Sequence, residues 1–184
     1  MRPGRLPVGT RQAYRRAGGR FPARAPGATV GGVPTAATVR PLRPDDHRAW
    51  AVLWAGYLRF YREDLAPDVT AETFRRLCAG TGGLFALVAC DEGDAPVGLA
   101  HAVLHPSTWS TGGYCYLEDL FVEPSARGGD VARDLVEEVA AEAARRGATK
   151  LHWQTQAYNG RARSLYDALG HVSSSVIYER DLPG

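Results

Sequence analysis

The order of elements around residues 116–139 constrains the fold of this chain more than any other feature. These residues read as a strand, a short loop rich in arginine and glycine, and then a helix. A further strand pattern follows at residues 149–156, so the helix connects two strands of one sheet. Strands joined through a crossover helix run parallel.

The residues before this strand–helix–strand unit predict strands that pair antiparallel instead of parallel. Residues 39–44 predict a short strand that Pro44 ends, and residues 45–61 carry large apolar side chains at helical spacing. A second helix is predicted over residues 70–78, with Thr70 as its N-cap. The other predicted elements are a hairpin of strands 84–90 and 97–105, a loop at 106–112, a strand at 113–124, helices at 130–146 and 159–170, and a last strand at 172–182. The fold class is therefore α/β, with a mixed central sheet that is antiparallel in its first half and flanked by helices.

The charge of the chain divides it into two domains. The formal net charge is +2, but residues 1–37 carry seven arginines and no acidic residue, which leaves about −5 on residues 38–184. Residues 1–37 are rich in Gly, Pro, Ala and Arg and lack hydrophobic periodicity, so we expect a disordered basic tail. A single lysine among 22 basic residues is typical of GC-rich bacterial genomes, where a start codon is easily assigned too early, so the native chain is expected to begin near Val30 or Val33.

The cysteines and the hydropathy exclude several classes of protein. The three cysteines, Cys78, Cys90 and Cys115, are widely spaced and lack the spacing of metal ligands, which favours a reducing cytoplasm over a disulfide framework. No apolar run approaches the 18 or more residues of a membrane span. We therefore expect a cytoplasmic protein with no membrane and no nucleic acid as a partner.

The loop at residues 126–133, "ARGGDVAR", is typical of a phosphate site. A helix N-terminus offers unpaired backbone N–H groups, and glycines let the backbone approach an anion closely. Gly128 and Gly129 precede the predicted helix, whereas the Walker-A and G-x-G-x-x-G patterns are both absent. On its own this loop is a weak signal, because Arg-Gly-Gly before a helix is often only a turn.

Two longer motifs make the signal specific. "YLEDLFVEPSARGGDVARDLV" and "NGRARSLYDALG", which begins 23 residues after the first motif ends, resemble the GCN5-related N-acetyltransferase (GNAT) superfamily over residues 38–182. Arg127 and Ala132 match its R/Q-x-x-G-x-G/A loop, and Asn159, Ala162 and Tyr166 match its N-x-x-A-x-x-x-Y helix. Within the superfamily, "YLEDLFV" is most similar to the spermidine/spermine and the yeast histone/polyamine acetyltransferases.

The resemblance implies acetyl-CoA as co-substrate, without a metal, bound between splayed parallel strands 4 and 5. The backbone of Leu120, Phe121 and Val122 would pair with the pantetheine arm. Asn159 would contact the cofactor near its pantetheine. The backbone amides of the loop and first helical turn would hold the pyrophosphate: Arg127, Gly128, Gly129, Asp130, Val131, Ala132 and Arg133.

The resemblance also assigns two catalytic candidates. Glu118 would take the proton from the amine, directly or through water. A solvated or ion-paired strand residue is the alternative for Glu118. Strand alternation sends Glu118 and Asp119 to opposite faces unless a bulge intervenes. Tyr166 would give a proton to the leaving thiolate, and a core aromatic is the alternative.

The candidates for binding the acceptor are Tyr57, Tyr61, Asp119 and Trp153. Aromatic rings with nearby carboxylates favour a cationic amine. An aromatic stripe at helical spacing is also typical of a core, so both interpretations stay open. His101, His105 and His152 lie on strands without a partner acid nearby in sequence.

The sequence thus predicts an N-acetyltransferase that moves an acetyl group to a small primary amine, such as a polyamine, an amino acid derivative or an amine antibiotic, by direct transfer in a ternary complex. A protein or peptide acceptor and a degenerate acyl-CoA sensor are the alternatives. The final strand, 172–182, is a candidate edge for a homodimer.

Asp130 departs from the motif, which usually has glycine there. As an N-cap, its carboxylate would accept from the amides of Ala132 or Arg133 and compete with a phosphate. Arg127 and Arg133 would neutralise it. The sequence therefore predicts weakened acetyl-CoA binding that Asp130→Gly improves.

Overall fold

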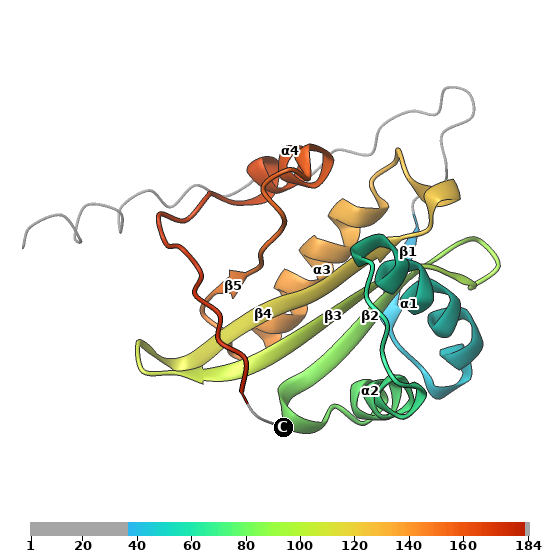
Figure 1. The fold of residues 1–184 in the computed structure, drawn as a ribbon, viewed down its shortest axis with the longest axis horizontal. Coiled ribbons are helices and arrows are strands. Elements are labelled where there is room, and N and C mark those ends of the chain that lie inside the picture. The colour runs from blue at the N-terminus through green and yellow to red at the C-terminus, as the bar shows by residue number, and fades with distance from the viewer. Residues whose placement is uncertain (1–36, 183–184) are drawn as a thin grey trace, which may run out of the picture. The chain divides into compact units, whose positions relative to one another are not determined.

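The structure, a computed structural model, describes residues 37–182. Five strands form one sheet in the order β1-β2-β3-β4-β5 (Figure 1). They are β1 (Thr38–Pro41), β2 (Leu84–Cys90), β3 (Pro96–Ser107), β4 (Ser110–Val122) and β5 (Leu151–His152). Neighbours from β1 to β4 pair antiparallel, while β4 and β5 pair parallel, which confirms the predicted mixed sheet.

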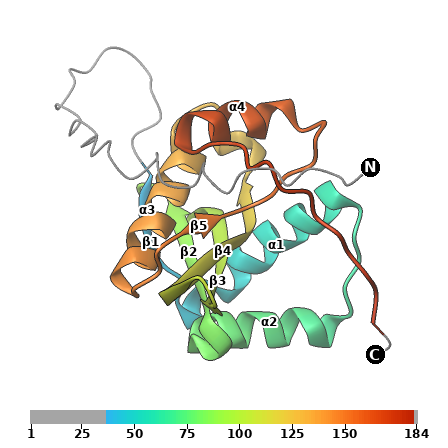
Figure 2. The ribbon, with the colours of Figure 1, turned by 90° about the vertical axis from the view of Figure 1, so that its left-hand side faces the viewer.

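Four α-helices flank this sheet, and three single-turn 3₁₀ helices, η1 (Pro44–Asp46), η2 (Thr81–Gly83) and η3 (Pro124–Ala126), lie in its connections. The helices are α1 (His47–Tyr61), α2 (Pro67–Ala79), α3 (Val131–Arg145) and α4 (Gly160–Leu169). In Figure 2, α3 lies on one side of the strands and α1 and α2 lie on the other. The sheet therefore separates two apolar layers.

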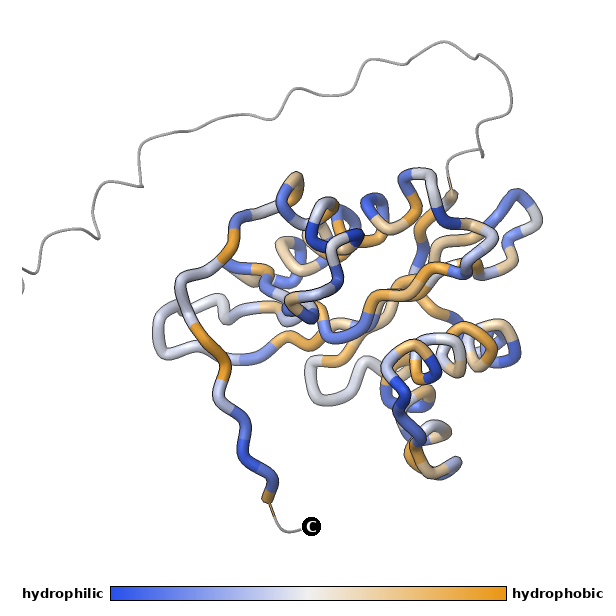
Figure 3. The backbone as a smooth tube through the Cα atoms, turned by 45° about the horizontal axis from the view of Figure 1, so that its top comes forward, coloured by the Kyte–Doolittle hydropathy of each residue, from blue (hydrophilic) through white to orange (hydrophobic). Residues whose placement is uncertain are grey.

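Strand β2 shows why the core has two layers. Its side chains alternate, so that Leu87 packs in the cluster on the α3 side and Val88 in the cluster with α1 and α2. Both residues are buried, as a strand covered on two faces requires. Hydrophobic residues accordingly run along the central strands in Figure 3. One apolar stripe of α3 faces this core and is buried; it comprises Val131, Leu135, Val139 and Ala143.

Helix α1 approaches β4 very closely at Gly56. A Cβ atom at Gly56 would lie 2.7 Å from the Phe121 ring, so glycine is needed for this approach. The next residue, Tyr57, is thereby held beside the C-terminal end of β4. Sequence periodicity predicted the helix but not this contact.

Several predicted boundaries are wrong. Helix α2 begins at Pro67, with Ala66 rather than Thr70 at its N-cap, because proline is well suited to the first helical turn. Residues 106–112 are mostly strand, since β3 and β4 continue to a pair between Ser107 and Ser110. Strand β5 is two residues long instead of eight.

The predicted last strand over residues 172–182 is absent from the described part of the chain. The segment has no regular secondary structure and no sheet partner there. A strand pattern in sequence becomes a strand only when it pairs with a neighbour, and this segment pairs with none of the described strands. The predicted basic tail, residues 1–37, lies outside the described residues except for Ala37.

Candidate active site

The site begins at an open edge of β4. Along one side, β4 pairs with β3 as far as Val122. Along the other, it pairs with β5 only at Cys115 and Tyr116. The edge from residue 117 to 122 therefore has no strand partner among the described residues, which confirms the splaying predicted for strands 4 and 5. An unpaired edge can accept an extended ligand as an additional strand.

A bulge lies at the start of this open edge. His101 pairs with Asp119 and Ala102 pairs with Leu117, so Glu118 is the extra residue of β4. Asp119 contacts His101, whereas Glu118 lines a shallow hollow with Val103 and Tyr116. The bulge thus brings both carboxylates to the face of the sheet that α1 covers in part, which simple strand alternation would not do.

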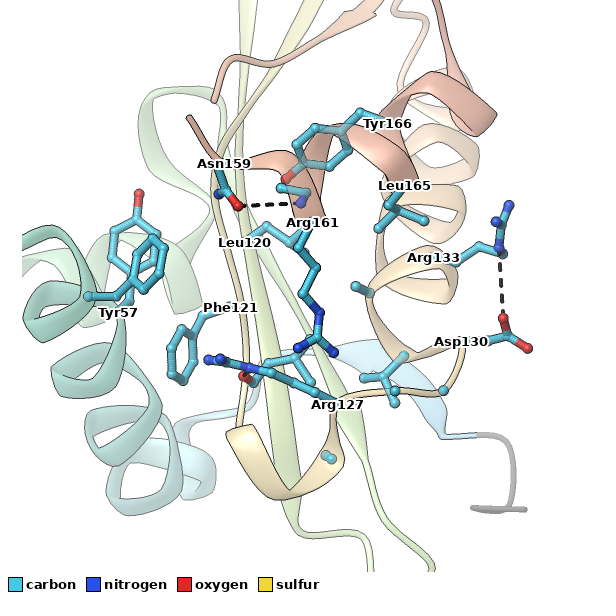
Figure 4. Close-up of a pocket in the computed structure, with 18 of the residues that line it drawn as sticks. Tyr57, Leu120, Phe121, Arg127, Asp130, Arg133, Asn159, Arg161, Leu165 and Tyr166 are labelled. Carbon is cyan, nitrogen blue, oxygen red and sulfur yellow. Dashed lines mark hydrogen bonds and ion pairs between the residues drawn. The ribbon is translucent and has the colours of Figure 1, made fainter. Parts of the chain in front are cut away.

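A pocket of about 350 Å³ adjoins the open edge (Figure 4). It lies between α1, the end of β4, the glycine loop and α4. The predicted residues that line it are Tyr57, Tyr61, Leu120, Phe121, Val122, Arg127, Gly128, Gly129, Asp130, Val131, Ala132, Arg133, Asn159 and Tyr166. The structure therefore gathers the predicted cofactor-binding residues and Tyr166 around one cavity.

The glycine loop leaves room for an anion at the N-terminus of α3. Gly128 has a φ of +103°, and no atom lies within 4 Å of a Cβ built at Gly128 or Gly129. Asp134 N–H donates to the Asp130 carbonyl at 2.8 Å, which closes the first turn of α3. The amides just before Asp134 are the donors that a helix N-terminus leaves free. The loop therefore fits a phosphate group.

Asp130 stands at the N-cap of α3, but its side chain caps nothing. The predicted hydrogen bond to Ala132 or Arg133 is absent. The carboxylate points away from the pocket in Figure 4 and lies 3.8 Å from Arg133 Nε. The prediction that it competes for the phosphate donors is therefore wrong in its geometry. With φ −86° and ψ 0°, Asp130 lacks the extended backbone with which an N-cap side chain usually reaches those amides.

Three arginines line the pocket: Arg133, which lies beside Asp130, and also Arg127 and Arg161. Arg127 donates from Nε to the Val122 carbonyl at 2.7 Å and lies over the Phe121 ring, so it does not neutralise Asp130 as predicted. Arg161 of α4 extends into the same pocket (Figure 4). Sequence analysis missed Arg161, although its place two residues after Asn159 in the second motif was a usable signal.

Asn159 starts α4 as its N-cap. Its side-chain oxygen accepts from Ala162 N–H at 3.3 Å, and its amide nitrogen donates to Thr155 Oγ1 at 3.2 Å. These two bonds hold the side chain at the pocket wall. The predicted contact with pantetheine stays a prediction.

Tyr57 and Tyr166 lie on opposite sides of the pocket, from α1 and α4 (Figure 4). Burial, and secondarily Tyr61, raises the pKa of Tyr166 to about 12. Burial followed by the charge of Asp119 raises the pKa of Tyr57 above its ordinary value as well. Both phenols therefore keep their protons at neutral pH.

Trp153 does not join the acceptor candidates. Its ring packs against Tyr166, with 5.5 Å between ring centres, and against Gly170. It also contacts the core cluster on the α3 side. Trp153 is absent from the lining of the pocket and packs in this structure, so its assignment to the acceptor site stays a prediction. The end of β5 turns it toward α4.

His101 has a partner acid that sequence analysis missed. Its Nδ1 lies 2.9 Å from Asp119 Oδ2, although the two residues are 18 positions apart. Its Nε2 lies 2.9 Å from Trp50 Nε1. Only the register between β3 and β4 brings the histidine and the acid together. No local sequence signal indicated the pair.

Glu118 combines solvent access with a perturbed acidity. The residue is exposed, yet partial burial of its carboxyl and then the negative charge of Asp119 raise its pKa above the ordinary value. A carboxylate with raised pKa is a stronger base than an ordinary glutamate. The geometry thus suits the predicted role without testing it.

The described residues contain neither a metal-binding cluster nor a helix that could span a membrane. Within residues 37–182, no group of three or more His, Cys, Asp or Glu side chains is arranged to hold a metal ion. None of the helices in that range is long and apolar enough to cross a membrane.

An open strand edge that leads from a free helix N-terminus to two carboxylates fits an enzyme that binds a phosphate-bearing donor along this edge. Comparison with known proteins agrees. The sequence pattern of the Acetyltransferase (GNAT) family matches residues 48–171. The D-amino-acid N-acetyltransferase HPA3 of Saccharomyces cerevisiae is 34% identical over 145 residues, which are 78% of this chain and 89% of the yeast protein.

Two further similar proteins are also acetyltransferases. The thialysine N-epsilon-acetyltransferase of Caenorhabditis elegans is 33% identical over 81 residues, 44% of this chain and 50% of that protein. The solved structure of AAC(6')-Iy with a CoA-based bisubstrate analog has a TM-score of 0.68 at 20% identity, covering 79% of this chain and 98% of that one, which shows a shared fold.

The chain belongs to the GNAT family of acetyltransferases. This confirms the predicted N-acetyltransferase class with acetyl-CoA as its co-substrate.

Proposed function

We propose that this enzyme acetylates a small primary amine by direct transfer within a ternary complex. The observation that carries the proposal is the continuous path from the free amides of α3, along the open edge of β4, to the bulge at Glu118 and Asp119. A donor bound along this path would end its acyl group beside the two carboxylates. Because donor and acceptor would meet at this one point of β4, the acetyl group can pass directly between them without a covalent enzyme intermediate.

We assign donor binding to backbone groups and arginines. The backbone from Leu120 to Val122 would pair with the amide-containing arm of acetyl-CoA as a strand does. The amides from Gly128 to Arg133 would hold its pyrophosphate. Arg127, Arg133 and Arg161 would balance the phosphate charge. Their presence around one pocket supports this assignment.

Acetyl-CoA supplies an activated acetyl group as a thioester. For this reaction, Glu118 would remove a proton from the amine nitrogen, directly or through water, because alkyl amines are mostly protonated at neutral pH. Tyr166 would donate its phenolic proton to the departing sulfur. A backbone N–H of the open β4 edge would stabilise the oxyanion.

The surroundings of the bulge favour a cationic acceptor. Tyr57 and Tyr61 line the pocket near Asp119, whose charge acts on both phenols. The yeast relative of this chain, HPA3, is named for D-amino acids, and the nematode relative is named for thialysine. Both kinds of compound are small and carry a primary amine. We therefore propose a compact, positively charged primary amine as the substrate.

A thiol-release assay with acetyl-CoA tests the proposal against D-amino acids, thialysine, polyamines, aminoglycosides and a histone-tail peptide. Calorimetry of acetyl-CoA binding runs alongside. Turnover of a small amine supports the proposal. Turnover of the peptide alone would show a protein acetyltransferase, and binding without turnover of any acceptor would show a sensor.

Replacement of Tyr166 by Phe tests the assigned acid. Loss of the phenolic proton should lower kcat by about 100-fold, which is typical of a lost general acid. Acetyl-CoA affinity should stay unchanged, because the ring itself is retained. Stopped-assay kinetics and calorimetry measure the two quantities, and full activity in Tyr166→Phe contradicts the assignment.

We also propose that the enzyme forms a homodimer through the segment 172–182. Its large apolar side chains are 64–91% exposed, and no strand of the described chain pairs with it. They are Val172, Val176, Ile177, Tyr178 and Leu182. Such a row of exposed apolar residues favours contact with another surface, here a second copy of this chain.

A further inference from the structure

The shallow hollow beside Glu118 extends away from the donor pocket, with which it shares no lining residue. His105 of β3, Tyr116 of β4 and His152 of β5 also line this hollow. His152 pairs with Tyr116 in the sheet, and Tyr116 lies two positions before Glu118. Two residues of a strand span about 6.6 Å. An acceptor whose amine contacts Glu118 can therefore reach the two histidines with a group only a few bonds away.

The two histidines of the hollow face each other, with 3.3 Å between their Nε2 atoms. His105 Nδ1 lies 3.0 Å from the Pro106 carbonyl, which can only accept, so this nitrogen keeps its hydrogen. In the neutral pair, His105 Nε2 is therefore bare and accepts the hydrogen of His152 Nε2. The pair shares a single hydrogen. With one more proton, each Nε2 would carry a donor directed into the same small space.

Positive charge gathers around this pair. The Lys150 Nζ lies 4.5 Å from the centre of the Tyr114 ring, and the same ring packs edge-on against His105 and His152, at 6.1 and 6.5 Å between ring centres. Burial, followed by the charges of Lys150 and His105, lowers the pKa of His152. We call His105, His152 and Lys150 the basic corner. A second proton on its histidine pair is therefore unfavourable unless an anion lies nearby.

Within residues 37–182, no carboxylate pairs with the basic corner. None of the ion pairs in that range includes His105, His152 or Lys150. The charges of Glu118 and Glu179 act on Tyr116, but neither carboxylate forms an ion pair with the corner. Repulsion between close cationic groups is relieved by an anionic ligand. The basic corner therefore suits a carboxylate brought by the substrate.

We propose that His105 and His152 bind a carboxylate group of the acceptor, so that the substrate is an amino acid rather than a polyamine. This inference rests on the proposed function. The pair would take up one proton from solvent, and the carboxylate would then accept an N–H from each Nε2, with Lys150 adding its charge. Because Glu118 holds the amine at the other end of the hollow, the two ends of the hollow recognise the two charged groups of one amino acid.

Steady-state kinetics with thialysine and with its carboxamide test this site, since the two acceptors differ only in the carboxyl group. His152→Phe and His105→Phe should each lower the ratio of kcat/KM for the acid to kcat/KM for the carboxamide by about tenfold, the effect of losing one hydrogen bond to a charged group. Phenylalanine keeps an aromatic ring in place. Each ratio is compared with that of the wild type, so any difference in amine basicity between the two acceptors cancels.

His171→Phe is the matched control, because His171 is exposed and lines neither cavity. It should leave the ratio unchanged. If His152→Phe and His105→Phe lower kcat/KM equally for the acid and the carboxamide, the ratio stays constant and the histidines serve only packing. That result, or an equal fall of the ratio in His171→Phe, overturns the proposal.

A second measurement does not depend on turnover. ¹⁵N NMR of the wild-type protein, with CoA in place of acetyl-CoA, follows the Nε2 atoms of His105 and His152. Saturating thialysine should protonate both atoms, whereas the carboxamide should leave one of them bare. A pair that thialysine leaves unchanged overturns the carboxylate site, whatever the kinetics. If wild type acetylates no amine, the proposed function fails, and this titration alone then decides whether the carboxylate site exists.

Discussion

At the scale of single residues, Asp130 is the residue whose interpretation the structure changes most. The carboxylate is on the outside of the loop, 63% exposed, with Arg133 beside it. An exposed pair of this kind contributes little free energy because water screens it. The side chain therefore leaves the amides of α3 available for a phosphate.

Asp130→Gly should accordingly tighten acetyl-CoA binding by about threefold at most, through the loss of one screened negative charge. Isothermal titration calorimetry at low and at physiological salt measures this effect, and the difference should vanish as salt rises. A gain of tenfold or more would show that the carboxylate does turn into the pocket.

The acidity of Glu118 gives a prediction about pH. Its pKa is raised by partial burial and by Asp119, so kcat should fall at low pH along a limb that lies above the range of an ordinary glutamate. Asp119→Asn removes the second cause and should move that limb to lower pH. The kcat–pH profiles of the wild type and of Asp119→Asn measure this shift. If the acidic limb has the same position in both proteins, the limb does not report the ionisation of Glu118.

At the scale of elements, an ion pair joins β1 to the start of α1. The Arg40 guanidinium contacts the Asp46 carboxylate through two bonds of 2.7 and 2.9 Å, and both side chains are at most 10% exposed. Asp46 also accepts from Arg43 N–H, which holds η1. The position of α1, and with it the position of Tyr57, therefore depends on the Arg40–Asp46 ion pair.

Asp46→Asn should lower the free energy of unfolding at pH 7 by about 2 kcal/mol, because it removes the buried carboxylate of the pair and leaves the Arg40 guanidinium with the exposed Asp94 as its remaining carboxylate partner. The Arg40 bond holds the pKa of Asp46 below its ordinary value. That contribution is present at neutral pH and is lost as pH falls through the lowered pKa. Urea unfolding should therefore show a gap between the proteins at pH 7 that narrows toward pH 3, and a gap independent of pH contradicts the assignment.

At the scale of the whole molecule, the proposed dimer can be tested by measuring the oligomeric state in solution. Ile177→Asp places a charge in the segment 172–182 and should convert dimers to monomers in light scattering after size exclusion. Val52→Asp is the control, because Val52 on α1 is 61% exposed, close to the 64% of Ile177, but lies outside the segment. A wild-type monomer, or an equal effect of both variants, rules the interface out.

The sequence alone was enough for the element order, the mixed sheet and the glycine loop before α3. These features depend on periodicity, turn chemistry and helix ends, which act between residues a few positions apart. The two motifs also identified the residues around the pocket, and the family match agrees with them.

Only the tertiary structure decided which side chains meet. The bulge at Glu118 and the pairing of His101 with Asp119 follow from the register of β3 and β4, which no local pattern encodes. The direction of Asp130, the packing of Trp153 on Tyr166 and the absence of a strand at 172–182 likewise depend on distant partners. Local interactions determined the elements of this enzyme, and long-range packing determined the geometry of its site.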